Sequence, residues 1–292
     1  MPPREHKRLR ATIMIPAYNE EAVIARGLKR ILDGANPGEF EIIVVCNACH
    51  DRTAAVAAAT APCARIIETD QPGKTNAVNL ADAAASAPVR IYLDADLEVD
   101  ADALRALIRP LEAGEALASC GRMRLDLSGC SLAVRAFYRV WILNPYLACG
   151  KFGGLFALSP EGRQRIHPLP NITADDEFVR RSFAVGERAI VEECEFTIRA
   201  PRTVSDLLKI RRRSLRGARD LDDRGIAATE STGVRSGASI LGRLYRRPDL
   251  WAQAVIYYAI SIWVQLTLAI ENPANTPRWE RDESSRFAAS GS

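Results

Sequence analysis

The stretch VRIYLDAD, residues 89–96, places two aspartates directly after a short run of mostly apolar residues. Such a run predicts a buried β-strand over 89–93. Three further runs of the same kind, at 12–16, 41–45 and 64–68, are each followed by a stretch with helical spacing. Short strands that alternate with helices predict parallel βαβ units with helices on both faces of the sheet. We therefore expect an α/β fold with a Rossmann-like, mostly parallel sheet.

The composition favours a protein with a sizeable core and speaks against several classes of partner. Of 292 residues, 48% are hydrophobic, and the formal net charge is +3 from 39 basic and 36 acidic residues. This balance is too even to predict nucleic acid as the partner. Seven irregularly spaced cysteines do not predict a disulfide framework, and no hydrophobic signal region follows the basic N-terminus. We therefore expect a cytoplasmic, reducing location.

Asp94 and Asp96 form a candidate metal site. A spacing of two puts both carboxylates on one side of an extended chain, and the carboxyl ends of parallel strands face the ligand. Two hard oxygen ligands suit Mg²⁺ or Mn²⁺, and such a cation stabilises a diphosphate leaving group. A solvated acidic turn is the alternative, because Glu98, Asp100 and Asp102 continue the acidity.

Other motifs accompany this pair in a fixed order. They are IPAYNEE at 15–21, Asn47 and DRT at 51–53, GKTNAVN at 73–79 and DDE at 175–177. Together the motifs resemble the inverting family 2 glycosyltransferases with a GT-A fold, over roughly residues 10–217. The resemblance implies transfer of a sugar from a nucleotide diphosphate donor to an acceptor hydroxyl, with inversion and with Mg²⁺ or Mn²⁺ as the cofactor.

The resemblance also implies roles for single residues on the donor side. The nucleotide pocket would be lined by Pro16, Ala17, Asn19, Glu20, Asn47 and Asp51. Asn47 stands where the family more often has an aspartate that contacts the nucleotide. Lys74 would approach the nucleotide or its phosphates, Asp94 would contact the nucleotide-sugar, and Asp96 would bind the metal.

On the acceptor side, the resemblance assigns catalysis to Asp176, with Asp175 beside it. Displacement at the anomeric carbon needs a base for the acceptor hydroxyl and charge stabilisation at the leaving group. Asp176 would be that base. The alternative for residues 175–177 is a helix N-terminus, where acidic residues oppose the helix dipole, and both interpretations can hold together.

Two further segments occupy family positions. Gly153 and Gly154 lie where the family has a glycine-containing segment near the acceptor and donor sugar, and a plain turn is the alternative. Residues 209–217, KIRRRSLRG, take the place of an arginine- and tryptophan-containing motif of processive members, with Ser214 where tryptophan is expected. Arg213 and Arg216 would meet a diphosphate or an anionic acceptor, or would form a solvated basic helix face.

The pentapeptide CNACH at 46–50 matches a haem-attachment pattern. Haem attachment belongs to exported proteins, and this chain shows no export signal. The pentapeptide also falls in a turn that the nucleotide pocket requires. We therefore expect its cysteines to pack as small apolar residues.

Residues 250–270 form an uncharged hydrophobic stretch that is close to the minimum length of a membrane span. One polar stripe runs along it, made of Gln253, Tyr257, Ser261 and Gln265. Three arrangements remain open: a span that pairs with another helix, a helix in the membrane interface, or a helix packed on the domain or on a second subunit. Arg243, Arg246 and Arg247 precede the stretch and favour a start beside anionic lipid, so we expect association with the inner face of a membrane.

These observations combine into one prediction. We expect a GT-A domain at 1–219, a linker or mobile loop at 220–248, a hydrophobic or amphipathic helix at 249–271 and a polar tail at 272–292. The predicted activity is glycosyl transfer to a lipid-linked or saccharide acceptor in cell-envelope synthesis, and a homo-oligomer could form through the C-terminal helix.

Two other functions compete with this prediction. A sugar-phosphate nucleotidyltransferase would need a glycine-rich phosphate loop where the sequence has AYNEE at 17–21. An inactive, membrane-associated nucleotide-binding scaffold is disfavoured by the retention of Asp94, Asp96 and Asp176.

Overall fold

The structure is a computed structural model that describes residues 9–144, 147, 150–226 and 236–270. Its strands are β1 (Ala11–Ala17), β2 (Phe40–Asn47), β3 (Arg65–Thr69), β4 (Val89–Leu93), β5 (Ala118–Asp126), β6 (Leu155–Leu158) and β7 (Arg188–Arg199). Its α-helices are α1 (Ile24–Gly34), α2 (Thr53–Thr60), α3 (Lys74–Ala84), α4 (Ala101–Glu112), α5 (Leu132–Trp141), α6 (Pro160–Ile166), α7 (Asp175–Ser182), α8 (Val204–Asp223), α9 (Ser236–Tyr245) and α10 (Trp251–Ile270). Two short 3₁₀ helices, η2 (Val185–Glu187) and η3 (Pro248–Leu250), complete the described elements.

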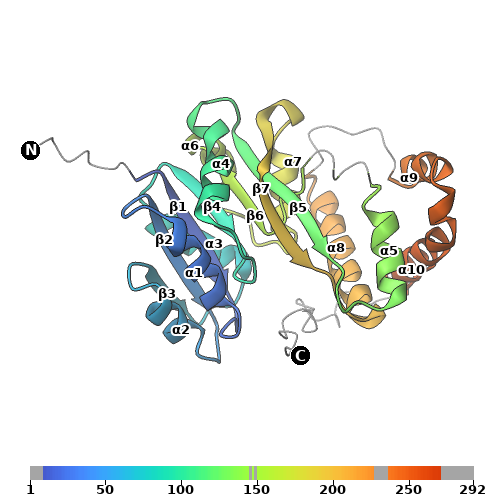
Figure 1. Ribbon diagram of the computed structural model, residues 1–292, viewed down its shortest axis with the longest axis horizontal. Helices are drawn as coiled ribbons and strands as arrows, with labels where there is room; N and C mark the ends of the chain where they lie inside the picture. Colours follow the sequence, from blue (N-terminus) through green and yellow to red (C-terminus); the bar gives the residue numbers. More distant parts are fainter. Residues whose placement is uncertain (1–8, 145–146, 148–149, 227–235, 271–292) are drawn as a thin grey trace, which may run out of the picture. The chain divides into compact units, whose positions relative to one another are not determined.

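The strands form one seven-stranded sheet in the order β3-β2-β1-β4-β6-β5-β7 (Figure 1). Strands β1 to β4 pair in parallel, with β1 between β2 and β4. Strand β6 is antiparallel to both β4 and β5. The predicted α/β fold with a mostly parallel, Rossmann-like GT-A-type sheet, flanked by helices and followed by a C-terminal helix, is confirmed.

The predicted strands β1, β2 and β4 were recognisable because the sheet buries them on both faces. All five residues of β4 are buried, and so are the six residues of β2 from 42 to 47. Even Arg90 within β4 is buried, with its guanidinium 3.0 Å from the Asp82 carboxylate. A strand buried on both faces reads as an unbroken apolar run rather than as an alternating pattern.

Helix α1 shows how a helix is fitted to this sheet. It buries Ile24, Gly27, Leu28 and Ile31, which share one face at the helical spacing. A Cβ on Gly27 would lie only 2.8 Å from the backbone oxygen of Leu97. Glycine therefore lets α1 pass close to the backbone segment that follows β4 and carries the aspartate pair.

The chain forms two compact units. The first comprises residues 1–123, 152–171 and 182–196, and it contains most of the sheet with α1 to α4 and α6. The second comprises residues 124–151, 172–181 and 197–292, and among the described elements it contains α5 and α7 to α10. Because the chain passes between the units several times, these units differ from the predicted boundaries, which followed chain order.

Two apolar contacts organise the second unit. Helix α10 packs against α5 and α8, and the ring of Tyr257 lies 5.0 Å from that of Phe137 between centroids. A separate cluster joins Ile172, Ala174 and Leu221, which ties the last turns of α8 to the segment before α7.

The segment at 220–248, predicted as a linker or mobile loop, is largely helical where it is described. Helix α8 continues to Asp223 because Leu221 is fully buried, and α9 occupies Ser236–Tyr245. Ile240 and Leu244 are four residues apart, and both are buried, so α9 has an apolar side. The glycine and serine residues around them made the segment resemble a loop in the sequence. Residues 227–235 lie outside the described residues.

The hydrophobic helix predicted at 249–271 appears as η3 followed by α10. By length and composition, the segment Pro248–Ile270 is the one candidate membrane span within the described residues. The predicted polar tail at 272–292 lies outside the described residues.

Candidate functional site

The end of β1 and the turn after it carry four of the predicted pocket residues. Pro16 and Ala17 end the strand, and Asn19 and Glu20 lie in the turn. Asn19 adopts a positive φ of 51°, and its Oδ1 accepts a hydrogen bond of 2.8 Å from the backbone N–H of His50. The backbone N–H of Glu20 donates to Thr53 Oγ1 at 2.8 Å. These bonds join the turn after β1 to the turn after β2, as expected for neighbouring parallel strands.

Cys49 contributes to this junction in a way that was not predicted. Its sulfur accepts from the Asn19 N–H at 3.4 Å and lies 3.5 Å from the Ala17 carbonyl oxygen, to which the thiol donates. Cys46 is buried as predicted, whereas half-buried Cys49 is a polar link between two turns. The apolar packing predicted for both cysteines is therefore wrong for Cys49. The contact occurs where Asn19 and Ala48 both have a left-handed backbone, which no sequence spacing reveals.

Asp51 closes the same junction from the other side. Its carboxylate accepts backbone hydrogen bonds from Thr53 at 3.0 Å and from Glu21 at 3.2 Å. Burial acts to raise the pKa of Asp51, but the hydrogen bonds from Thr53 and Glu21 outweigh it, so the pKa is lowered. Asp51 is thus an ionised anchor of the turns, and a direct contact with a nucleotide stays a prediction.

Asn47, Lys74 and Asp94 are brought together as predicted. Buried Asn47 accepts a 3.0 Å hydrogen bond from the N–H of Gly73, whose φ of 139° lies in a region that favours glycine. Lys74 then begins α3, and its Nζ lies 2.9 Å from Asp94 Oδ1 at the end of β4. One chain of contacts therefore runs from the end of β2 through the start of α3 to the end of β4.

Gly154 lies beside the aspartate pair. Its carbonyl accepts the N–H of Asp94 at 2.8 Å, and its φ of 86° is in the left-handed region. A Cβ there would lie 2.8 Å from a methyl carbon of Leu97 and 3.8 Å from Asp94 Oδ2. Gly154 is therefore closely packed beside the end of β4, and the neighbouring Gly153 is buried. The predicted place of these glycines near the acceptor and donor sugar stays a prediction.

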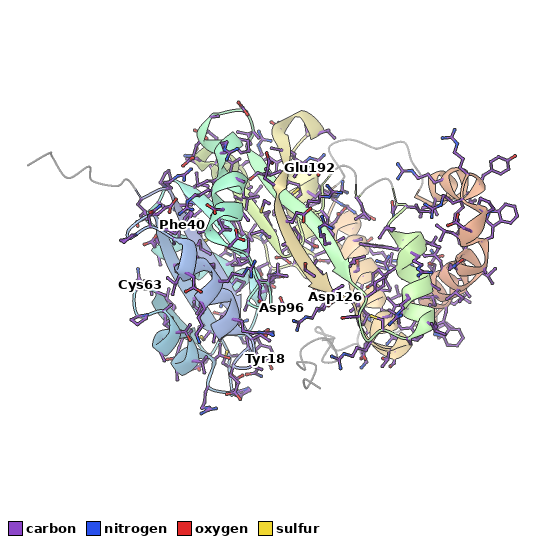
Figure 2. All side chains as sticks on the ribbon, in the orientation of Figure 1. Tyr18, Phe40, Cys63, Asp96, Asp126 and Glu192 are labelled. Carbon is purple, nitrogen blue, oxygen red and sulfur yellow. The ribbon has the colours of Figure 1, made fainter. Side chains whose placement is uncertain are left out.

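Asp96 is exposed in the turn after β4. Figure 2 shows Tyr18 and Asp96 toward one end of the sheet, while Phe40, which begins β2, lies at the other end. The carboxyl ends of β1 and β4 therefore present their polar residues on the same side, as a parallel arrangement requires.

Asp94 and Asp96 fit a hard divalent cation by the chemistry of their oxygen donors. In the part of the chain that the structure describes, no group of three or more histidine, cysteine, aspartate or glutamate side chains could hold a metal ion. Mg²⁺ is commonly bound by one or two carboxylates together with substrate phosphates and water. The pair therefore suits a cation that arrives with a diphosphate.

The predicted catalytic residues Asp175 and Asp176 open helix α7 in the second unit. The alternative of an acidic helix N-terminus is thus confirmed, and the catalytic role stays a prediction. Glu177 lies 2.6 Å from Arg180 and 2.9 Å from Arg181. Burial acts to raise the pKa of Glu177, but the two arginines outweigh it, so the pKa is lowered.

The three acidic residues have different environments. Asp175 is only 7% exposed, and Glu177 is held by its arginines. Asp176 is half-buried, and its Oδ1 accepts the N–H of Glu177 at 2.8 Å. Asp176 is therefore the carboxylate that combines partial access to solvent with a fixed orientation.

Helix α8 supports the start of α7 by a close approach. A Cβ on Gly217 would lie 2.7 Å from the Cβ of Ala174, the residue before α7. Arg213 and Arg216 lie half-buried on the same helix, and Ser214 between them is exposed. Their predicted contact with a diphosphate or an anionic acceptor stays a prediction.

Part of the chain matches a known protein family. Residues 12–141 match the model of "Glycosyl transferase family 2". Uncharacterized glycosyltransferases of Mycobacterium bovis and Mycobacterium tuberculosis are 34% identical to the chain over 113 residues, which is 39% of this chain and 48% of each relative. The chain thus spans about half the length of the curated relatives it matches.

Solved structures share the fold at low sequence identity. Glucosyl-3-phosphoglycerate synthase from Mycobacterium tuberculosis, in complex with Mn²⁺, UDP-glucose and phosphoglyceric acid, has a TM-score of 0.55 at 23% identity, covering 75% of this chain and 81% of that one. A mannosyltransferase from Pyrobaculum calidifontis, in complex with GDP-mannose and Mn²⁺, has a TM-score of 0.59 at 21% identity, covering 91% and 77%.

Proposed function

We propose that the chain, whose residues 12–141 match the model of "Glycosyl transferase family 2", transfers a hexose from a nucleotide diphosphate donor to an acceptor hydroxyl with inversion. The observation that carries this proposal is the 2.9 Å contact between Lys74 and Asp94. It joins two separate family motifs at the carboxyl edge of the sheet, where α/β proteins bind their ligands.

The donor would bind at the ends of β1, β2 and β4. Lys74 provides a positive charge for the diphosphate, and Asn47 fixes the start of the helix that carries Lys74. Asp94 and Asp96 would hold a divalent cation, which when bound supplies further positive charge to stabilise the leaving diphosphate. The turns after β1 and β2, fixed through Asn19, would receive the nucleoside.

We assign the role of base to Asp176. The acceptor hydroxyl must lose a proton as its oxygen attacks the anomeric carbon, and a carboxylate can accept that proton. Asp175 is buried and Glu177 is engaged by two arginines, whereas Asp176 is only half-buried, so Asp176 is the acidic residue of α7 that we assign. Attack from the face opposite the leaving diphosphate gives inversion.

The substrate class is proposed from the fold neighbours. Their complexes contain UDP-glucose or GDP-mannose with Mn²⁺, so we propose a UDP- or GDP-linked hexose as the donor. For the acceptor we propose a lipid-linked or saccharide hydroxyl in cell-envelope synthesis at the cytoplasmic side.

A thermal-shift screen tests the proposal. UDP-, GDP- and dTDP-linked sugars are each added to the full chain with Mn²⁺ or with excess chelator, because a ligand that binds the native state raises its melting temperature. One donor should raise the melting temperature with Mn²⁺ and support transfer or slow hydrolysis. A screen in which no donor shifts the melting temperature and none is cleaved would reject the proposed function.

A matched pair of variants tests the cation separately. Asp96→Asn should abolish the Mn²⁺-dependent part of the shift. Asp102→Asn, which alters an exposed side chain of the same acidic segment, should retain it. Equal shifts for the two variants, or full transfer in excess chelator, would contradict the cation site.

A further inference from the structure

Helix α10 turns its polar stripe toward the protein. Its buried residues are Tyr257, Ile260, Val264 and Leu268. The helix packs against α5 (Figure 1) and against α8. The ring of Tyr257 lies close to that of Phe137 on α5. Of the four residues in the predicted stripe, Tyr257 is buried, Gln253 and Ser261 are half-buried, and Gln265 is exposed. The polar side of this helix therefore lies largely on its packed face.

The opposite side of α10 is apolar and exposed. Its large hydrophobic side chains are 55–84% exposed and are Trp251, Val255, Ile262, Trp263, Leu266 and Ile270. At 3.6 residues per turn they fall within about 120° of the helix circumference. No charged residue occurs in the helix. We call these six residues the apolar face of α10, and such a contiguous face marks an interaction surface.

The elements next to α10 are basic. Helix α5, which packs on α10, carries exposed Arg135 and Arg139. The segment before α10 adds Arg243, Arg246 and Arg247, all exposed. Across residues 132–141 and 236–270 the single acidic residue is Asp249, which pairs with Arg247 at 2.7 Å. These two segments therefore hold five arginines against one aspartate, in a chain whose whole formal charge is +3.

We propose that α10 docks in the plane of an anionic lipid bilayer, with its apolar face in the acyl region and the neighbouring arginines at the headgroups. An apolar surface flanked by arginines complements a negatively charged bilayer. Trp251 and Trp263 lie on the apolar face, and tryptophan is enriched where membrane and water meet. This inference does not depend on the proposed sugar transfer.

In-plane docking fits the packing of α10 better than a span. A span would require α10 to leave α5 and α8, which would expose Phe137 and place the half-buried Gln253 and Ser261 in hydrocarbon. Docking in the plane keeps those contacts and covers only the apolar face. The hydropathy and length of Pro248–Ile270 therefore reflect one membrane-facing side together with one protein-facing side.

Two other partners for the apolar face, a second copy of the chain and the segment at 272–292, fit less well than a bilayer. A helix of this length offers a footprint of roughly 30 Å by 10 Å, or about 300 Å², against about 800 Å² per partner in a typical stable complex. The sequence at 272–292 contains Arg278, Glu280, Arg281, Asp282, Glu283 and Arg286. A second copy would need additional surface, and so polar a segment would not bury the apolar face.

Sedimentation with lipid vesicles tests the proposal on the full chain. The protein should sediment with vesicles of phosphatidylcholine and phosphatidylserine, and binding should weaken with added salt and without phosphatidylserine. Ile262→Asp combined with Leu266→Asp should lower the bound fraction at least tenfold. Ile190→Asp, at an exposed position of β7, is the matched control and should bind like the wild type. All variants should keep the wild-type melting temperature, because the altered side chains are exposed.

A second set of variants tests the charges and the geometry. Arg139→Gln combined with Arg246→Gln should reduce binding to phosphatidylserine vesicles severalfold. Alkaline carbonate should release the protein from vesicles, as it does for proteins that do not span. Resistance to carbonate would overturn in-plane docking, and equal binding with and without phosphatidylserine would overturn the role of the arginines.

The remaining outcomes concern the other occupants. Self-association that Ile262→Asp with Leu266→Asp abolishes, in a protein that does not bind vesicles, would assign the apolar face to a second copy. Vesicle binding that appears only after removal of residues 271–292 would assign it to that segment. Either result overturns the proposal, whereas vesicle binding that is unchanged by the truncation supports it.

Discussion

The turns at the ends of β1 and β2 and the first turn of α7 hold their polar groups in different ways. In the turns, Asn19, Cys49 and Asp51 accept hydrogen bonds from backbone N–H groups. In α7, the acidic residue Glu177 is held by ion pairs with Arg180 and Arg181. Backbone hydrogen bonds fix the shape of the turns after β1 and β2, which suits them to bind a ligand. In α7 the ion pairs engage Glu177 and not the neighbouring Asp176, which suits Asp176 to act as a base.

The sharpest test of this contrast is Asp176→Asn. If α7 supplies the base, turnover should fall by about 10² to 10⁴, the usual contribution of general base catalysis, while donor binding is kept. Steady-state kinetics and donor titration measure the two effects separately. Glu192→Gln, at an exposed carboxylate, is the control. Turnover close to that of the control would remove Asp176 as the base.

Gly217→Ala tests whether the close approach of α8 positions α7. The added methyl would lie 2.7 Å from the Cβ of Ala174, so the free energy of unfolding should fall by roughly 1–3 kcal/mol through overpacking. Gly242→Ala, where the added methyl meets no atom within 4 Å, should leave stability equal or slightly higher. Urea unfolding distinguishes the two. Equal stability of both variants would show that the contact relaxes without cost.

Lys74→Gln tests the donor side. Loss of the ammonium that lies 2.9 Å from Asp94 should weaken donor binding by about tenfold, equivalent to about 1.4 kcal/mol. The reduction should be larger for the nucleotide diphosphate than for the nucleoside. Lys29→Gln, an exposed lysine on α1, controls for the loss of one charge. If both lysine variants bind the donor equally, Lys74 does not contact the phosphates.

The smallest expected effect is the pH dependence of the ion pairs of α7. The pKa of Glu177 is lowered in the folded chain, so its contribution to stability is complete above the pKa of the unfolded state, about 4.3 for glutamate. That contribution is lost as the pH falls through the folded pKa. The melting temperature of the wild type should therefore exceed that of Glu177→Gln near neutral pH, and the difference should shrink below about pH 4.3.

Glu115→Gln, at an exposed carboxylate, is the matched control for that measurement. A difference between wild type and Glu177→Gln that stays constant from neutral to acid pH would contradict the linkage.

The sequence allows the sheet to be predicted because burial on both faces leaves a continuous apolar run, as in β4. It also places Asn47, Lys74 and Asp94 in one neighbourhood, because parallel strands bring their carboxyl ends together. The ends of some helices depend instead on contacts with residues far away in the chain, which a local sequence pattern does not reveal. Helix α8 extends past the predicted boundary because of one buried side chain, Leu221, which meets partners far away in the chain.

The role of Cys49 shows a second limit. Its sulfur accepts from the backbone of Asn19, and both Asn19 and Ala48 have positive φ. Neither residue type demands that conformation, so the motif CNACH suggested haem chemistry or apolar packing instead. Where a side-chain contact occurs beside an unusual backbone conformation, the identity of the residues alone does not predict that contact.

The link formed by Cys49 also makes the thiols of this chain usable as reporters. Burial raises the pKa of Cys46, Cys120 and Cys194 to about 12 each, so these thiols resist alkylation at neutral pH. Cys63 is exposed and half-buried Cys49 lies between the turns after β1 and β2. With Cys63 and Cys149 replaced by serine, the rate at which Cys49 is alkylated measures how often these turns separate and whether a nucleotide keeps them together.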